Sequence, residues 1–344
     1  MTFRPFKHLA AIACVSLASP PGVASAETVL FVGNSFTFGA YSPVRAYAPA
    51  TVNDLNHEQI GGVPAIFKTF TRAMGMEWDV SLETSPGQDL AFHLTQKRAE
   101  IGKHWDYVIL QGLSTLSMSE PGNPATHVAA ANGLADLFHQ QNPKAKVFLQ
   151  STWSRADLAY VQQSPWLGQP IERMAEDISE KSKAAVAPSG KLAGTIEVGK
   201  AWNLAFQQKI ADPNPYDGID FGRVSLWTWD QYHASAEGYY LAALMIFGSI
   251  TKIDPRLLTG KETAAQDLGI NPQVARRLQD VAATELKFPP LPAEVEAERA
   301  KVFWIGPDGR PVGPVGGRSA TLPGPADQSN TSHSPAASAP TRPH

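Results

Sequence analysis

The sequence has very little cysteine and no excess of positive charge. Cys14 is the one cysteine among 344 residues, which excludes a disulfide framework and any cysteine-rich zinc or iron–sulfur site. Its 29 basic residues are outnumbered by 32 acidic ones, for a formal charge of −3, so a general affinity for nucleic-acid phosphates is not expected. The sequence also lacks a Gly-rich phosphate loop and a histidine pair with metal-ligand spacing. We therefore expect no cofactor, no bound metal and no nucleic-acid partner.

The first 26 residues differ in composition from the rest of the chain. A basic start is followed by the short apolar run Leu9 to Leu17 and then by Ala24-Ser25-Ala26. This order is typical of a secretory signal with a small-residue cleavage site, and the apolar run is too short to cross a bilayer. We expect an exported bacterial protein, periplasmic or secreted, without stable membrane insertion. A lipid anchor at Cys14 is the alternative.

The C-terminal segment, residues 289–344, is rich in proline, glycine and serine. It contains 11 of the 28 prolines of the chain. Because such a composition cannot bury enough apolar surface to form a core, it predicts a largely disordered tail. Residues 27–288 are then left as the folded part, a suitable size for one domain.

Within residues 27–288, short apolar segments alternate with segments of helical periodicity. Strands are expected at residues 28–33, 77–84, 105–111, 146–150 and 192–198, and helices at 63–74, 90–101, 126–141, 171–186 and 235–250. Apolar strands separated by helices predict an α/β fold with a parallel sheet covered on both faces. Right-handed crossovers then give a three-layer α/β/α sandwich with a central parallel sheet. In such sheets ligands bind beyond the carboxyl ends of the strands.

A serine and a histidine occur where that rule places chemistry. Ser35 follows the first strand in Gly33-Asn34-Ser35, and a serine nucleophile needs a neighbouring base because its own pKa is too high. His233 lies just before the last apolar helix, with Asp230 three residues earlier. The carboxylate can hold one imidazole nitrogen and leave the other for the serine. Either segment alone is also compatible with an ordinary turn or a solvated loop.

Taken together, the two segments resemble the SGNH (GDSL-like) hydrolase superfamily, in a variant with Gly-Asn-Ser in place of Gly-Asp-Ser. The stretch that begins at His233, His-Ala-Ser-Ala-Glu-Gly-Tyr-Tyr-Leu-Ala-Ala, resembles the H-x-S-x-x-G-x-Y-L-A-A stretch of those enzymes. The resemblance spans residues 28–255. It implies a flavodoxin-like α/β/α fold with Ser35 as nucleophile, His233 as general base and Asp230 as the residue that orients the base.

The resemblance also implies an oxyanion hole. The backbone N–H of Ser35 would be one donor, and Gly87 in Ser85-Pro86-Gly87-Gln88 would be the second. The usual third donor is an asparagine after the next strand, but here Gln111 follows that strand. Its side-chain amide offers the same donor one methylene further out, and Asn34 is the other candidate.

The expected activity is hydrolysis of carboxylic esters, with short acyl groups such as acetyl on a small molecule or a carbohydrate. The long insertion at residues 41–62 is expected to line or cover the site. Four tryptophans near the expected site would either stack on sugar rings or serve as core anchors: Trp153, Trp166, Trp227 and Trp229. Two alternatives stay open, namely acyl transfer to a polysaccharide hydroxyl by the same triad and a non-catalytic glycan-binding protein on the same scaffold.

Overall fold

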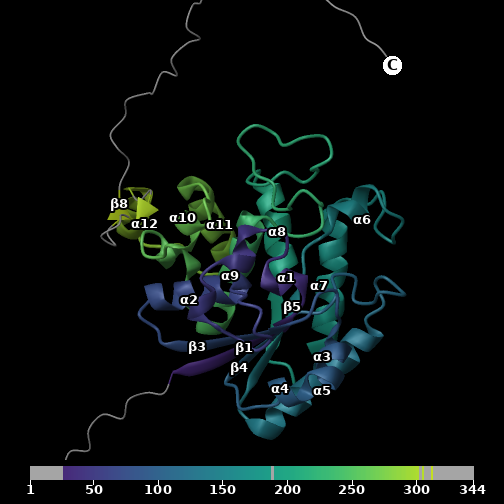
Figure 1. The fold of residues 1–344 in the computed structure, drawn as a ribbon. Coiled ribbons are helices and arrows are strands. Elements are labelled where there is room, and N and C mark those ends of the chain that lie inside the picture. Colours follow the sequence, from purple (N-terminus) through teal and green to yellow (C-terminus); the bar gives the residue numbers. More distant parts are fainter. Residues whose placement is uncertain (1–25, 187–189, 302–303, 306–310, 313–344) are drawn as a thin grey trace, which may run out of the picture.

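The computed structural model describes residues 26–186, 190–301, 304–305 and 311–312. The expected secretory signal therefore lies almost wholly outside the described residues, as does most of the expected tail. Six strands form one all-parallel sheet in the order β2-β3-β1-β4-β5-β6, with helices around it (Figure 1). The predicted α/β sandwich with a central parallel sheet is confirmed.

The elements have the following bounds. The sheet consists of β1 (Glu27–Gly33), β2 (Asn53–Asp54), β3 (Trp78–Thr84), β4 (Tyr107–Leu110), β5 (Lys146–Ser151) and β6 (Gly194–Glu197). The α-helices are α1 (Ser35–Phe38), α2 (Gly62–Ala73), α3 (Leu90–Gln96), α4 (Arg98–Ile101), α5 (Ala125–Gln141), α6 (Ala156–Tyr160), α7 (Glu172–Val186), α8 (Val198–Gln207), α9 (Ala236–Thr251), α10 (Ala264–Asp267), α11 (Pro272–Glu285) and α12 (Ala293–Lys301). Short 3₁₀ turns occupy η1 (Pro43–Ala46), η2 (Pro49–Thr51) and η3 (Pro255–Leu258), and β7 (Trp304–Ile305) pairs antiparallel with β8 (Pro311–Val312).

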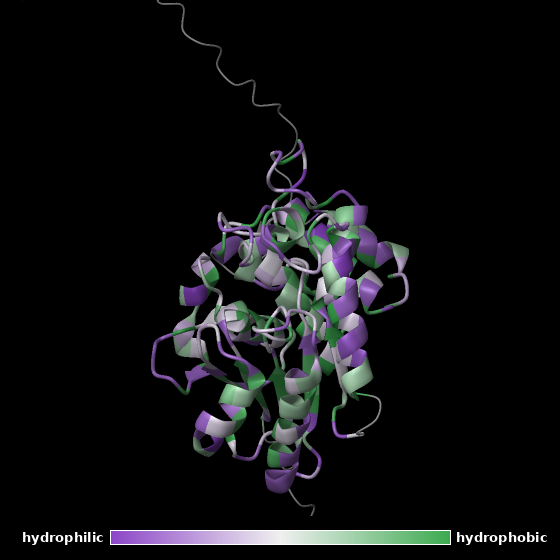
Figure 2. Cartoon of the chain, turned by 90° about the vertical axis from the view of Figure 1, so that its right-hand side faces the viewer, coloured by the Kyte–Doolittle hydropathy of each residue, from purple (hydrophilic) through white to green (hydrophobic). Residues whose placement is uncertain are grey.

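The apolar residues of the strands serve two separate cores. In β1, Val29 and Phe31 face the core under α2, α8 and α9, whereas Leu30 and Val32 face the core under α3 and α5. Successive side chains of a strand point to opposite faces, so a strand covered on both faces must be apolar at every position. Figure 2 shows hydrophobic residues on the strands and hydrophilic ones on the outer turns of the helices.

Helix α9 is almost entirely buried. Every residue from Gly238 to Ile250 is buried. The helix begins at the N-cap Ser235, whose hydroxyl oxygen accepts from the N–H of Gly238 at 3.2 Å. An N-cap of this kind satisfies one of the free donors of the first turn. Since α9 follows His233 almost directly, a well-anchored helix fixes the position of that histidine.

Several elements differ from the expectation. The helix expected at 90–101 is two helices, α3 and α4, which meet at Lys97, where the side chain turns toward Glu83 at 3.7 Å. The insertion at 41–62 is not only loop, because β2 adds an edge strand to β3. Helix α12 lies inside the segment expected to be a tail. Its Arg299, 4% exposed, forms an ion pair with Asp280 of α11 at 2.8 Å.

Among the residues that the structure describes, none of the helices has the length and apolar character needed to cross a membrane.

Candidate active site

Ser35 begins the short helix α1 directly after β1. Asn34 is the N-cap, and its side-chain oxygen accepts from the N–H of Phe36 at 3.2 Å. The carbonyl oxygen of Ser35 accepts from the N–H of Ala40 and from the hydroxyl of Tyr239, each at 3.1 Å. Within the described residues, the backbone N–H of Ser35 has no hydrogen-bond partner. The turn is therefore held from several sides while one donor stays available.

His233 and Asp230 lie in a closed loop before α9. The N–H of Thr228 donates to the carbonyl of His233 at 2.8 Å, and Trp227 forms an antiparallel bridge with Ala234. Nδ1 of His233 lies 2.6 Å from Oδ2 of Asp230. The carboxylate thus engages one ring nitrogen, which leaves Nε2 as the nitrogen that can accept a proton.

The Asp230 carboxylate is fixed by its own loop. Its Oδ1 accepts from the hydroxyl of Thr228 at 2.8 Å and from the N–H groups of Tyr232 and His233 at 3.0 and 2.9 Å. Burial raises the pKa of the Asp230 carboxyl, but the hydrogen bonds from His233, Thr228 and Tyr232 lower it by more, so that its pKa falls below the ordinary value. The carboxylate is therefore charged near neutral pH and orients the imidazole.

Aromatic rings surround the His233 imidazole. Its ring centroid lies 5.6 Å from that of Phe36, 5.0 Å from that of Tyr41 and 4.1 Å from that of Tyr232. His233 is only 6% exposed. These rings limit the orientations that the imidazole can adopt, in addition to the restraint from Asp230.

Gly87 lies in a tight turn after β3. Ser85, Pro86, Gly87 and Gln88 have the residue order of a type II turn, with proline at the second position and glycine at the third. The φ angle of Gly87 is +68°, which the third position of that turn requires and which glycine adopts without strain. In the described part of the chain, no hydrogen bond occupies the N–H of Gly87, so it too remains free to bind a ligand.

These groups meet at one cavity of about 410 Å³. Its lining consists of Ser35, Phe38, Ala40, Tyr41, Arg45, Pro86, Gly87, Tyr232 and His233. The structure thus brings together the expected nucleophile, the expected base and one expected oxyanion donor. Tyr232 was not expected there, although its place directly before His233 could have suggested it. The insertion contributes Tyr41 and Arg45, as its length and position predicted.

Gln111 and Asn34 do not line this cavity. The side-chain Nε2 of Gln111 donates to Oδ1 of Asn34 at 3.0 Å and to the carbonyl of Gly112. The Nδ2 of Asn34 donates to the carbonyl of Gln88 at 3.0 Å. In this geometry both amides, which were expected as alternative third oxyanion donors, bond to other parts of the protein.

Three of the four tryptophans near the site are anchors. Trp153, Trp166 and Trp227 are at most 2% exposed, whereas Trp229 is 74% exposed. Trp229 packs edge-on against Tyr41 at a centroid distance of 5.4 Å. Because Tyr41 lines the cavity, these two rings form an aromatic rim beside it, and Trp229 is the tryptophan with a free face.

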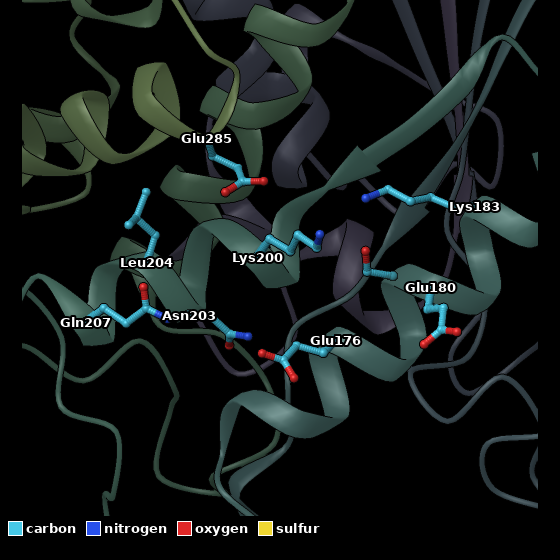
Figure 3. A pocket seen from close by; sticks show the side chains of 9 residues that line it. Glu176, Glu180, Lys183, Lys200, Asn203, Leu204, Gln207 and Glu285 are labelled. Carbon is cyan, nitrogen blue, oxygen red and sulfur yellow. The ribbon is translucent and has the colours of Figure 1, made fainter.

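A larger groove of about 510 Å³ lies elsewhere, between α7, α8 and α11 (Figure 3). Its labelled side chains include the cations Lys183 and Lys200 and the carboxylates Glu176, Glu180 and Glu285. Neither a histidine nor the residues of the first cavity contribute to it. The described residues contain no group of three or more histidine, cysteine, aspartate or glutamate side chains that could hold a metal ion.

The comparisons with known proteins concern the fold. No protein-family model and no curated protein matches the sequence. A DUF4886 family protein from Bacteroides uniformis is 18% identical, with a TM-score of 0.53 over 79% of this chain and 99% of that one. A protein named as a GDSL-like lipase from Parabacteroides merdae is 17% identical over 66% of this chain and 95% of that one, with a TM-score of 0.45. A family 3 carbohydrate esterase from Clostridium thermocellum is 15% identical over 65% and 94%, with a TM-score of 0.40. The chain thus shares its fold with the first of these structures.

Proposed function

We propose that the protein is a serine hydrolase that cleaves carboxylic esters with Ser35, His233 and Asp230. The observation that carries this proposal is the cavity at which Ser35, His233 and the free N–H of Gly87 meet, with Asp230 bonded to the far side of the imidazole. A nucleophile, a base, an orienting carboxylate and an oxyanion donor are the parts that acyl transfer needs.

The chemistry follows from the positions of these groups. Nε2 of His233 takes the proton as Oγ of Ser35 attacks the ester carbonyl, and the N–H groups of Ser35 and Gly87 hold the oxyanion. The protonated His233 then returns the proton to the leaving alcohol, which leaves an acyl group on Ser35. A water molecule, deprotonated by His233, attacks that acyl group, and the carboxylic acid departs as Ser35 recovers its proton.

The acyl and alcohol parts of the substrate are expected to meet different surroundings. Phe38, Ala40 and Pro86 give the cavity an apolar lining, which suits a short acyl chain. The aromatic rim of Tyr41 and Trp229 offers flat faces that suit the apolar face of a sugar ring. We therefore propose an acetylated or similarly acylated carbohydrate as substrate, and an exported location in keeping with the N-terminal sequence.

The test is hydrolysis of p-nitrophenyl acetate by the full chain and by its Ser35→Ala variant. We expect activity in the first and its loss in the second, while Ser119→Ala, a change at an exposed serine that does not line the cavity, retains it. Equal rates for the parent and the Ser35→Ala variant would refute the nucleophile. Labelling by a fluorophosphonate probe at Ser35 would also exclude a purely glycan-binding role.

The exposed rim also favours a second candidate, transfer of the acyl group from Ser35 to a sugar hydroxyl instead of water. A saccharide held against Trp229 could present that hydroxyl to the acyl group. Product analysis with and without an added oligosaccharide separates the two reactions, since transfer yields an acylated sugar and hydrolysis yields free acid.

A further inference from the structure

Gln111 and Asn34 form a pair of buried amides behind the nucleophile. Gln111 is 1% exposed and Asn34 is 4% exposed. Gln111 follows β4 and Gly33 ends β1, and the two strands lie side by side with Val32 opposite Leu110. A buried amide is costly unless its donors and acceptors are satisfied, so the bonds of this pair show what it holds.

Each polar atom of Gln111 contacts the nucleophile segment or its own strand end. The Oε1 accepts from the N–H of Asn34 at 3.0 Å and from the hydroxyl of Thr37 at 2.8 Å. The Nε2 donates to Oδ1 of Asn34 at 3.0 Å and to the carbonyl of Gly112. A Cβ at Gly33 would lie 2.8 Å from Oε1 of Gln111, so the close approach of this amide depends on the glycine.

The side chain of Asn34, which Gln111 holds, forms hydrogen bonds to two further segments. Its Oδ1, held by Gln111, caps α1 by accepting from Phe36. Its Nδ2 donates to the carbonyl of Gln88 at 3.0 Å, the last residue of the turn that contains Gly87. One side chain therefore bonds both to the helix that starts at Ser35 and to the turn that supplies the other proposed oxyanion donor.

We propose that Gln111 is a positioning residue, which acts through Asn34 to fix the spacing between the Ser35 and Gly87 N–H groups, and that the oxyanion hole has two backbone donors. This proposal rests on the proposed function. It assigns to the amide after β4 a supporting role instead of direct contact with the oxyanion. The physical reason is preorganisation, because oxyanion donors stabilise a transition state only when they are held in place before the reaction.

The test is a double-mutant cycle with Gln111→Ala, Asn34→Ala and the double variant, assayed on p-nitrophenyl acetate. If Gln111 acts through Asn34, Gln111→Ala lowers kcat by roughly 10- to 100-fold with little change in KM. The loss in the double variant is then smaller than the product of the two single losses, because both substitutions break the bond between the two side-chain amides. If Gln111 were an independent third donor, the two losses would multiply, and this result would overturn the proposal. An unchanged kcat in Gln111→Ala would overturn it as well.

Gln279→Ala is the matched control. Gln279 is 2% exposed and donates to the Tyr240 hydroxyl at 2.8 Å, away from the cavity. We expect this variant to lose stability as Gln111→Ala does but to keep kcat, so that a general structural loss is told apart from a loss of positioning. An equal fall in kcat at Gln279 would contradict the positioning role.

A second readout does not depend on activity. The same cycle measured by urea unfolding is expected to be non-additive in the unfolding free energy, because either single substitution breaks the bond between the two side-chain amides. Strict additivity in unfolding free energy would refute the coupling even if no ester were hydrolysed. Absence of Ser35-dependent hydrolysis with a coupled unfolding cycle would instead refute the proposed function, and with it the catalytic part of this inference.

Discussion

Two of the carboxylate–histidine pairs in the described part of the chain differ in what faces the second ring nitrogen. In the first, Asp230 holds Nδ1 of His233, and the imidazole borders the cavity that Ser35 lines. In the second, Glu83 contacts Nδ1 of His93, both side chains are fully buried, and Nε2 of His93 has no partner among the described residues. An oriented imidazole alone therefore does not distinguish the proposed catalytic base. It also needs a nucleophile and room for a substrate.

Substitution of the first pair, Asp230 and His233, is expected to have the largest effect on activity. His233→Ala removes the proposed base, and Asp230→Asn leaves the imidazole without its orienting charge, so each should lower kcat for p-nitrophenyl acetate by about 10³-fold or more. The Asp230 side chain is partly exposed and His233 borders the cavity, so far-UV circular dichroism should show a folded protein for both variants. If kcat survived in His233→Ala, the distinction between the two pairs would fail.

Substitution in the second pair, Glu83 and His93, should lower the free energy of unfolding without changing the rate of ester hydrolysis. His93→Phe keeps an aromatic ring but leaves the buried Glu83 carboxylate without its main partner, with the Lys97 ammonium 3.7 Å away. Loss of one member of a buried pair costs about 3–5 kcal/mol. Urea unfolding is expected to show this loss, while kcat measured well below the melting temperature is unchanged. His104→Phe, at an exposed histidine, is the control and should alter neither.

Another buried carboxylate, Glu262, sharpens the comparison because no histidine is among the described groups that shift its pKa. It accepts from the Tyr240 hydroxyl at 2.9 Å and from the N–H of Ala265 at 3.1 Å. Burial raises the pKa of Glu262 from 4.5 to about 7, in spite of these bonds. A carboxyl with a higher pKa in the folded state binds its proton more tightly when folded, so its contribution to stability is greatest below pH 4.5 and declines toward pH 7.

The contribution of Glu262 to the free energy of unfolding is expected to decline by on the order of 3 kcal/mol between pH 4.5 and pH 7. Glu262→Gln cannot ionise, so its unfolding free energy should fall less than that of the parent over the same range. Urea unfolding at several pH values measures the difference. Parallel curves for the two proteins would show that Glu262 does not titrate in this range.

The smallest effect on activity is expected at the aromatic rim of Tyr41 and Trp229, beside the cavity that His233 borders. Trp229→Ala removes the exposed indole, and a stacking contact worth about 1 kcal/mol corresponds to a roughly fivefold rise in KM for an acetylated oligosaccharide. Trp229→Phe should restore most of the affinity, and KM for p-nitrophenyl acetate should not change. Equal effects on both substrates would argue against a sugar-binding role for this ring.

Local sequence predicted the parts of the site that adjacent residues determine. Asp230 and His233 are three residues apart in one loop, and Ser35 follows a strand whose apolar pattern is plain. The pair of Glu83 and His93 has no such local signal, because the two residues lie in different elements and meet only after folding. For that reason the sequence singled out one carboxylate–histidine pair and gave no indication of the other.

The fold shows the same division between local and distant determinants. Five of the six strands of the parallel sheet followed from the alternation of apolar strands and helices. The sixth, β2, has only two residues and pairs with β3 because the chain returns to that edge. Gln111 was expected to be an oxyanion donor because of its amide and its place directly after a strand. Its actual bonds depend on the neighbouring strand end and on the space left by Gly33.

The hydrogen bond from the Tyr239 hydroxyl to the Ser35 carbonyl connects the candidate site to the buried helix α9. Burial raises the pKa of Tyr239 well above its ordinary value, so its hydroxyl stays protonated and donates to the Ser35 carbonyl. Tyr239 belongs to α9, whose buried residues form the centre of one core, and the same helix follows His233. The nucleophile segment and the loop of His233 are therefore both tied to α9, and we expect heat inactivation to coincide with the cooperative unfolding of the domain.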